Sequence, residues 1–83
     1  MKVKQITLDD EEMPERVLLD CSHDEAVLIA ALLGRQDAGD LAAVVPHGGR
    51  LGAEVYDALA GSVFNRFYDD GVAGAVDAIR RRP

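Results

Sequence analysis

The first quarter of the chain carries a pattern of apolar and polar positions that is typical of a β-hairpin. Residues 2–8, KVKQITL, are β-prone although their alternation is imperfect, and residues 16–20, RVLLD, form a second short apolar run. The acidic connection 9–15, DDEEMPE, separates them, and its Pro14 cannot donate a hydrogen bond to a strand ladder. The pattern predicts two antiparallel strands joined by a long loop, with two lysines of the first strand discouraging edge-to-edge aggregation.

The next segment carries the signals of a helix start, a helix body and a helix stop. Ser22 and Glu25 have the S-x-x-E spacing of a capping box, in which each side chain satisfies a backbone N–H of the other residue. The apolar run 26–33 follows, and Gly34 stands where a helix terminator is expected. A helix over 23–33 is therefore predicted. It is apolar on nearly every side, so we expect it to be buried all round, by the rest of the chain or by a second subunit.

Two more helices are predicted in the second half of the chain. Over 52–68, apolar side chains recur every four residues, and such a broad stripe is typical of a helix face directed to the core. The stripe consists of Leu51, Val55, Leu59, Val63 and Phe67. A last helix over 72–81 begins after Asp70, which can cap it, and the arginines at 80–82 suit its negative end. The short apolar piece 41–45 is compatible with a strand or with a single helical turn.

These elements together predict one α+β domain spanning residues 1–83. We expect a two- or three-stranded antiparallel sheet packed on about three helices. The length of 83 residues fits one domain, and no repeat or low-complexity segment marks a boundary. All four aromatic residues fall between positions 56 and 68, so this segment is expected to carry the bulkiest part of the core.

Charge and cysteine content narrow the classes of function. The net charge of −6 argues against binding to nucleic-acid phosphates or anionic membranes, both of which need a basic surface. The single cysteine cannot form an intrachain disulfide, which fits a reducing compartment. The first ten residues lack the apolar core of a signal peptide, and the longest apolar run is too short to span a bilayer. We therefore expect a soluble cytoplasmic protein with no nucleic-acid or membrane partner.

The stretch Cys21-Ser22-His23-Asp24 brings together the side chains from which nucleophilic active sites are built. Neighbouring residues on one helical turn point in different directions, whereas a catalytic triad converges on one reacting atom from separate segments. We therefore interpret the stretch as a helix start and assign no catalytic residue. Cys21 is interpreted as a small buried residue, and the alternative is a reactive thiol at a helix N-terminus.

The remaining residues raise two kinds of candidate ligand site, one for a small anion and one for a metal ion. His47, Gly49 and Arg50 belong to a glycine-rich loop before a helix, which is a candidate site for a small anion, with a flexible turn as the alternative. The loop lacks the GK[ST] of a phosphate-binding P-loop. No pair of cysteine, histidine or aspartate residues has the spacing of a zinc site, and the acidic run is no calcium loop. Neither a metal nor a cofactor is expected.

Two further groups of residues are candidates for protein binding. The acidic run Asp9, Asp10, Glu11 and Glu12 is either solvated surface or a patch for a basic partner. The aromatic side chains of the second helix are either ordinary core or an uncovered contact surface. They are Tyr56, Phe64 and Tyr68.

Two segments, VLLDCSHDEAVLIAALLG and GAEVYDAL, together resemble small uncharacterised accessory proteins of actinobacterial bacteriophages. The resemblance covers roughly residues 16–60, and the chain departs from it after Leu59. It implies a nonessential accessory protein that acts in the cytoplasm of the host cell and supplies no catalytic residues. The function expected from it is non-enzymatic binding of a host or phage protein. The alternative is a self-associating, homodimeric module that binds a small anionic ligand or supports an assembly. An enzyme built around Cys21 or His47 is the third hypothesis.

Overall fold

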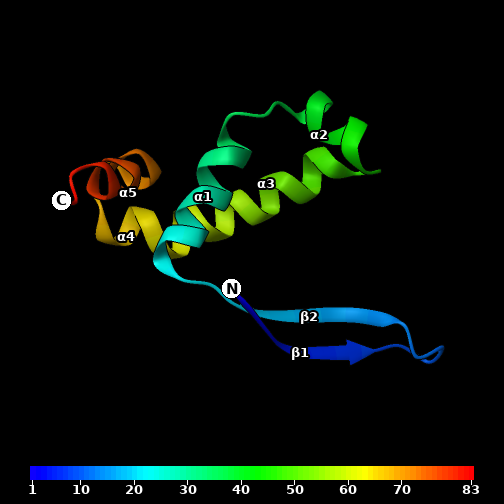
Figure 1. Ribbon diagram of the computed structural model, residues 1–83. Helices are drawn as coiled ribbons and strands as arrows, with labels where there is room; N and C mark the ends of the chain where they lie inside the picture. Colours follow the sequence, from blue (N-terminus) through cyan, green and yellow to red (C-terminus); the bar gives the residue numbers. More distant parts are fainter.

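The computed structural model describes every residue from Met1 to Pro83 and shows a β-hairpin followed by helices (Figure 1). Strands β1 (Lys2–Leu8) and β2 (Pro14–Asp20) pair antiparallel in a two-stranded sheet. The helices are α1 (His23–Gly34), α2 (Ala38–Val44), α3 (Gly48–Leu59), α4 (Asn65–Phe67) and α5 (Gly71–Arg80), with the π-helical turn η1 (Ala60–Phe64) joining α3 to α4. The α+β class is confirmed. The piece 41–45 is not a third strand, because most of it belongs to α2.

The hairpin turn is built by the acidic connection. The carboxylate of Asp9 accepts hydrogen bonds from the backbone N–H groups of Glu11 and Met13, at 2.9 and 3.0 Å. Glu12 adopts a positive φ of 63°, which closes the turn. Strand β2 begins at Pro14, two residues before the predicted start, because the first position of a strand tolerates the missing N–H.

Helix α1 begins with the predicted capping box. The Ser22 hydroxyl accepts from the backbone N–H of Glu25 at 3.1 Å, and the Glu25 carboxylate accepts from the backbone N–H of Ser22 at 2.9 Å. The rest of the chain does not bury this helix all round, so the first of the two expected forms of burial is wrong and burial by a second subunit stays a prediction. Val27 and Ala30 are buried, whereas Leu28 on another face is 66% exposed. No other part of the chain covers that face.

The long helix formed by α3, η1 and α4 turns a different face to the core from the predicted one. The predicted stripe is largely solvent-accessible, and Phe67 at its end is 69% exposed. The core-facing row lies one residue further along, where Gly52, Ala60 and Phe64 are buried. Both rows repeat every four residues. The second faces α1 because its small residues let the helices approach, while the Phe64 ring fills the centre.

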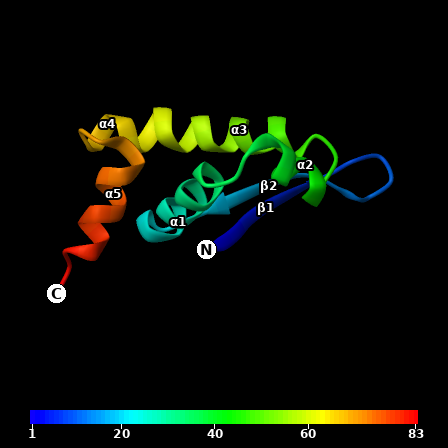
Figure 2. The ribbon, with the colours of Figure 1, turned by 90° about the horizontal axis from the view of Figure 1, so that it is seen from above.

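The hydrophobic core is small and lies where α1, η1 and α5 meet. Its buried members are Val27, Ala30, Phe64 and Ala75, and partly buried side chains such as Tyr56 and Tyr68 pack against them. Only 8 of the 83 residues are buried, so most apolar side chains of the chain remain in contact with solvent. In Figure 2 the long helix forms one rod, with α5 turning away at its end. Asp70 stands at the N-cap position of α5, as predicted, but its side chain makes no capping hydrogen bond.

The hairpin projects from the helical part as an arm. Every residue of β1 and β2 is exposed, and neither strand packs against a helix (Figure 1). The expected packing of the sheet on the helices therefore does not occur. The arm explains the radius of gyration of 14.7 Å, because a compact domain of this length has about 12 Å.

Candidate binding surfaces

The residue pairs on one side of the arm are all apolar. Residues directly opposite one another on paired strands project to the same side of the sheet. The pairs Val3 with Leu19, Ile6 with Val17 and Leu8 with Pro14 share one side, which we call the arm face. The five aliphatic side chains of the arm face are between 46% and 58% exposed. An apolar surface of this kind on an isolated hairpin is typical of a protein-interaction site.

A β-bulge creates the arm face. The register moves from Val3 opposite Leu19 to Gln5 opposite Leu18, so Lys4 is an extra residue in β1. In a regular strand, Val3 and Ile6 would project to opposite sides, because successive side chains alternate. The bulge shifts the alternation by one position and brings both side chains to one side. The imperfect alternation of the sequence is therefore the pattern of a bulged amphipathic strand.

The opposite side of the arm is largely polar. It carries the pairs Lys2 with Asp20, Gln5 with Leu18 and Thr7 with Arg16. The acidic run at positions 9–12 forms the exposed tip of the arm, far from the helices (Figure 1). The structure thus places the predicted acidic residues at the end of the arm, next to its apolar face.

A second uncovered apolar surface follows the long helix. We call it the helix stripe and define it as Leu51, Val55, Val63 and Phe67, all of which are exposed. In a regular α-helix, a row of residues four positions apart winds slowly around the helix axis. The π-turn η1 has more residues per turn, so it winds the row partly back and keeps the stripe closer to one side. The first half of the stripe borders an apolar groove of about 210 Å³ between α2 and α3, which Val44 and Val45 also line.

The predicted aromatic contact residues belong mostly to the core. Phe64 is completely buried, and its ring lies edge-to-face with His23 at a centroid distance of 6.0 Å. Tyr56 and Tyr68 are partly buried and pack against the core cluster. Ordinary core, which was the alternative interpretation, is the role that the structure shows for Phe64. The expectation that the aromatic segment carries the bulkiest part of the core is confirmed by Phe64, whereas the stripe from Leu51 to Phe67, predicted to face the core, is largely exposed.

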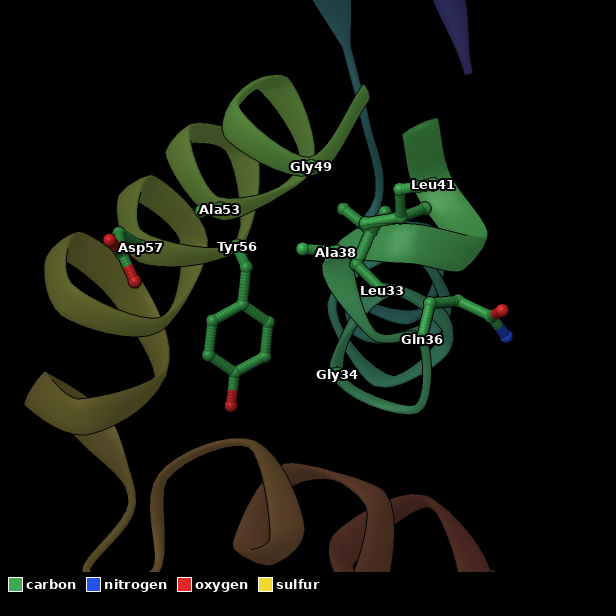
Figure 3. Close-up of a pocket in the computed structure, with 10 residues that line it drawn as sticks. Leu33, Gly34, Gln36, Ala38, Leu41, Gly49, Ala53, Tyr56 and Asp57 are labelled. Atoms are coloured by element: carbon green, nitrogen blue, oxygen red, sulfur yellow. The ribbon is translucent and has the colours of Figure 1, made fainter. Parts of the chain in front are cut away.

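The largest cleft lies between the end of α1, α2 and α3, and its volume is about 370 Å³ (Figure 3). Figure 3 shows the Tyr56 ring projecting from α3 beside Gly34, whereas the Asp57 carboxylate points away from it. A side chain at Gly34 would meet that ring at 3.1 Å. The polar side chains of the lining are those of Gln36, Tyr56 and Asp57, and none of them is basic. The cleft therefore offers no positive charge for an anion.

The glycine-rich loop serves the packing of α3 against α2. A Cβ atom at Gly48 would lie 2.0 Å from the Leu41 carbonyl oxygen, so only glycine fits there. His47 precedes it in the left-handed region, with φ at 64°. The Arg50 guanidinium is 3.5 Å from the Glu54 carboxylate, which would compete with an anion for that charge. Gly49 lies against Ala38 of α2. The structure thus shows packing roles for Gly48 and Gly49 and an ion pair for Arg50, and the anion site at His47, Gly49 and Arg50 stays a prediction.

The stretch Cys21 to Asp24 combines the predicted helix start with contacts that no sequence pattern indicated. His23 Nδ1 lies 2.8 Å from the Asp24 carboxylate, and His23 Nε2 lies 2.7 Å from the Tyr68 hydroxyl. Arg82 donates two hydrogen bonds to the Asp24 carboxylate, at 2.6 and 3.0 Å. These contacts span 45 and 58 positions of the chain. They tie the start of α1 to the end of the long helix and to the C-terminal segment.

The charges of this region shift the pKa values of two carboxyl groups. Hydrogen bonds from Arg82, and after it His23, hold the pKa of Asp24 below its ordinary value of 3.8. Hydrogen bonds from the Met1 amino group and from Ser22 lower the pKa of Glu25 from 4.5 to about 2. Cys21 is a free, half-buried thiol. The network lies at the surface, and its polar groups bond to one another.

Comparisons with other proteins found no match that would indicate a function. No protein-family model matches the chain, and neither does any curated protein or any solved structure. None of the helices has the length and apolar character needed to cross a membrane. No group of three or more histidine, cysteine or acidic side chains gathers in a way that could hold a metal ion.

Proposed function

We propose that this chain is a non-enzymatic protein-interaction module that binds another protein through the arm face. The observation that carries the proposal is a hairpin on one side of which every paired residue is apolar and which no part of its own chain covers. A two-stranded hairpin without packing on either face is only marginally stable in water. A partner that buries the arm face would remove apolar surface from solvent and would stabilise the hairpin at the same time.

The non-enzymatic part of the proposal is supported by the partners of His23, since neither Cys21 nor Ser22 is hydrogen-bonded to it. Ser22 serves the capping box, and His23 is bonded to both Asp24 and Tyr68. The resemblance to bacteriophage accessory proteins suggests a host or phage protein as the partner, met in the host cytoplasm. The acidic tip would then add attraction to a basic surface of that partner.

A pull-down with matched arm variants tests this proposal. The tagged chain, its double variant Ile6→Ser with Val17→Ser and a control variant Gln5→Ser with Thr7→Ser are incubated with an actinobacterial lysate treated with nuclease. The first variant changes the arm face, and the second changes the polar side of the same strands. We expect the wild-type chain and the control to retain a bound protein, whether foreign or a second copy, and the arm-face variant to lose it.

The helical part should stay folded in both variants, because the arm does not pack against it. Circular dichroism of the three chains checks this point. Equal capture of the same proteins by all three folded chains would contradict binding through the arm face.

Self-association is the second candidate function, and a separate observation favours it. The chain carries the helix stripe in addition to the arm face, so it has two uncovered apolar surfaces rather than one.

A further inference from the structure

The chain exposes more surface than a folded chain of its mass normally does. Its accessible surface is 6466 Å² for 8.9 kDa. A monomeric protein of that mass exposes roughly 4,800 Å², so roughly 1,650 Å² per chain is left over. Two chains that each covered this area would bury roughly 3,300 Å² in total, which lies within the range of obligate homodimers, about 2,000–5,000 Å².

The arm face and the helix stripe match in length. Each strand of the arm has seven residues, which at about 3.3 Å per residue gives roughly 23 Å. The stripe runs from Leu51 to Phe67, which at about 1.5 Å per residue gives roughly 26 Å. One apolar surface is therefore long enough to cover the other from end to end.

The arm is held away from the helix stripe of its own chain. Only Cys21 and Ser22 separate β2 from α1, and the backbone N–H of Ser22 is bonded to Glu25 in the capping box. The Met1 amino group at the start of β1 lies 2.5 Å from the same carboxylate. Both strands are thus fastened to the first turn of α1. These contacts favour the orientation in which the arm projects from the helical part (Figure 1).

We propose that a second copy of this chain occupies both surfaces, with the arm of each copy lying on the helix stripe of the other. This inference rests on the proposed binding function of the arm face and names its partner. Each copy has one arm and one stripe, so a two-fold axis lets both contacts form at once and closes the assembly as a dimer. The arm face enters the groove beside Leu51 and Val55 and continues along the long helix to Val63 and Phe67.

Charges at the ends of the stripe fit the same arrangement. Arg50 and Arg66 adjoin its two ends in sequence, and the Arg66 guanidinium lies 5.2 Å from the centroid of the Phe67 ring. The acidic tip of the partner's arm reaches the Phe67 end of the stripe, where Arg66, which forms no ion pair within its own chain, attracts it. A chain with a net charge of −6 would otherwise repel its own copy.

The first measurement is the molar mass of the full chain by sedimentation equilibrium over a range of concentrations. We expect twice the chain mass of 8.9 kDa for the wild type. Val17→Asp on the arm face and Val55→Asp on the helix stripe should each give the single-chain mass, because each places a carboxylate in both contacts of the dimer. The controls Thr7→Asp, on the polar side of the arm, and Ala53→Asp, on another side of α3, should remain dimeric.

A mixture of the two monomeric variants tests the exchange of arms. The Val55→Asp chain keeps an intact arm face, and the Val17→Asp chain keeps an intact helix stripe. Their 1:1 mixture therefore retains one of the two contacts and should form a heterodimer, weaker than the wild-type dimer, although neither variant dimerises alone. A dimer built from arm against arm, or from stripe against stripe, would be broken by only one of the substitutions.

The outcomes separate this inference from the proposed function. A wild-type chain that is monomeric at every concentration, or a dimer unaffected by Val17→Asp, overturns the second copy as the partner. If the second copy is overturned but the Ile6→Ser, Val17→Ser variant loses a foreign protein that the wild-type chain captures, the proposal of binding through the arm face is still supported. If it captures the same proteins as the control, both proposals fail.

Discussion

The hydroxyl of Tyr68 lies 2.7 Å from Nε2 of His23, so the end of the long helix is hydrogen-bonded to the start of α1. The Asp24 carboxylate accepts a hydrogen bond from the Nδ1–H of His23, so in the neutral ring Nε2 accepts a hydrogen bond from the Tyr68 hydroxyl. This contact lies beside Phe64, the largest completely buried side chain of the core. It therefore helps to fix the angle between two helices whose shared core is small.

Removing that hydroxyl should weaken the fold slightly. We expect Tyr68→Phe to lower the free energy of unfolding by about 1 kcal/mol, because one hydrogen bond is lost while the ring stays in place. Urea denaturation followed by circular dichroism measures the change. Tyr56→Phe is the matched control, since no hydrogen bond of the Tyr56 hydroxyl is present. An equal loss in both variants would mean that the contact to His23 contributes nothing specific.

The pair of Asp24 and Arg82 should give a pH-dependent contribution to stability. Since the folded pKa of Asp24 is lowered, the contribution is present above 3.8 and is lost as the pH falls through the lowered folded value. We expect Arg82→Gln to raise the pKa of Asp24 toward 3.8, with His23 still holding it slightly below. Titration of the Asp24 carboxyl carbon by NMR measures it. Arg81→Gln, whose side chain forms no ion pair, should leave the pKa unchanged, and a similar rise there would refute the pairing.

The contact of Gly48 with α2 should tolerate no side chain. In Gly48→Ala the new Cβ would meet the backbone of Leu41 at 2.0 Å, so α2 and α3 must separate. We expect a loss of about 1–3 kcal/mol in the free energy of unfolding, as for other overpacked sites.

Gly61→Ala is the matched control for this prediction, because no atom lies within 4 Å of the new Cβ. Alanine is favoured over glycine within a helix, so we expect a gain of up to about 1 kcal/mol. Thermal unfolding of both variants gives the two shifts. The packing argument fails if Gly48→Ala is as stable as the wild type.

The capping box should contribute measurably to the stability of α1. We expect Ser22→Ala to cost about 1 kcal/mol, because the backbone N–H of Glu25 loses its side-chain acceptor. Ser62→Ala, at an exposed position of η1, serves as the control and should have little effect. Denaturant unfolding measures the stability of both variants. Equal unfolding midpoints for Ser22→Ala and Ser62→Ala would show that the cap does not contribute to stability.

Local structure could be predicted from local sequence signals. The capping box of α1, the two strands and the turn between them depend on residues within a few positions of one another. Their energies are set by backbone geometry, hydrogen bonds and turn chemistry that the sequence displays directly. Asp9, for example, forms the turn with groups only two and four positions away.

Tertiary contacts decided what the sequence left open or indicated wrongly. The long helix has two overlapping apolar rows, and hydrophobicity alone favoured Leu51 to Phe67. Packing selected the row of Gly52 and Phe64, because close approach of α1 needs small residues beside one large ring. The bonds of Asp24 to Arg82 likewise join segments whose distance in the chain carries no local signal.

The candidate binding surfaces were also determined partly by the sequence and partly by the tertiary structure. By itself, the sequence determined a short hairpin, a capped helix and an acidic connection between the strands, since these follow from neighbouring residues. Only the tertiary structure showed that the bulge at Lys4 gathers the apolar side chains of the hairpin on one side and that no helix of the chain covers them. The reason is that burial depends on how separate elements pack in space, and periodicity reports only which faces are apolar.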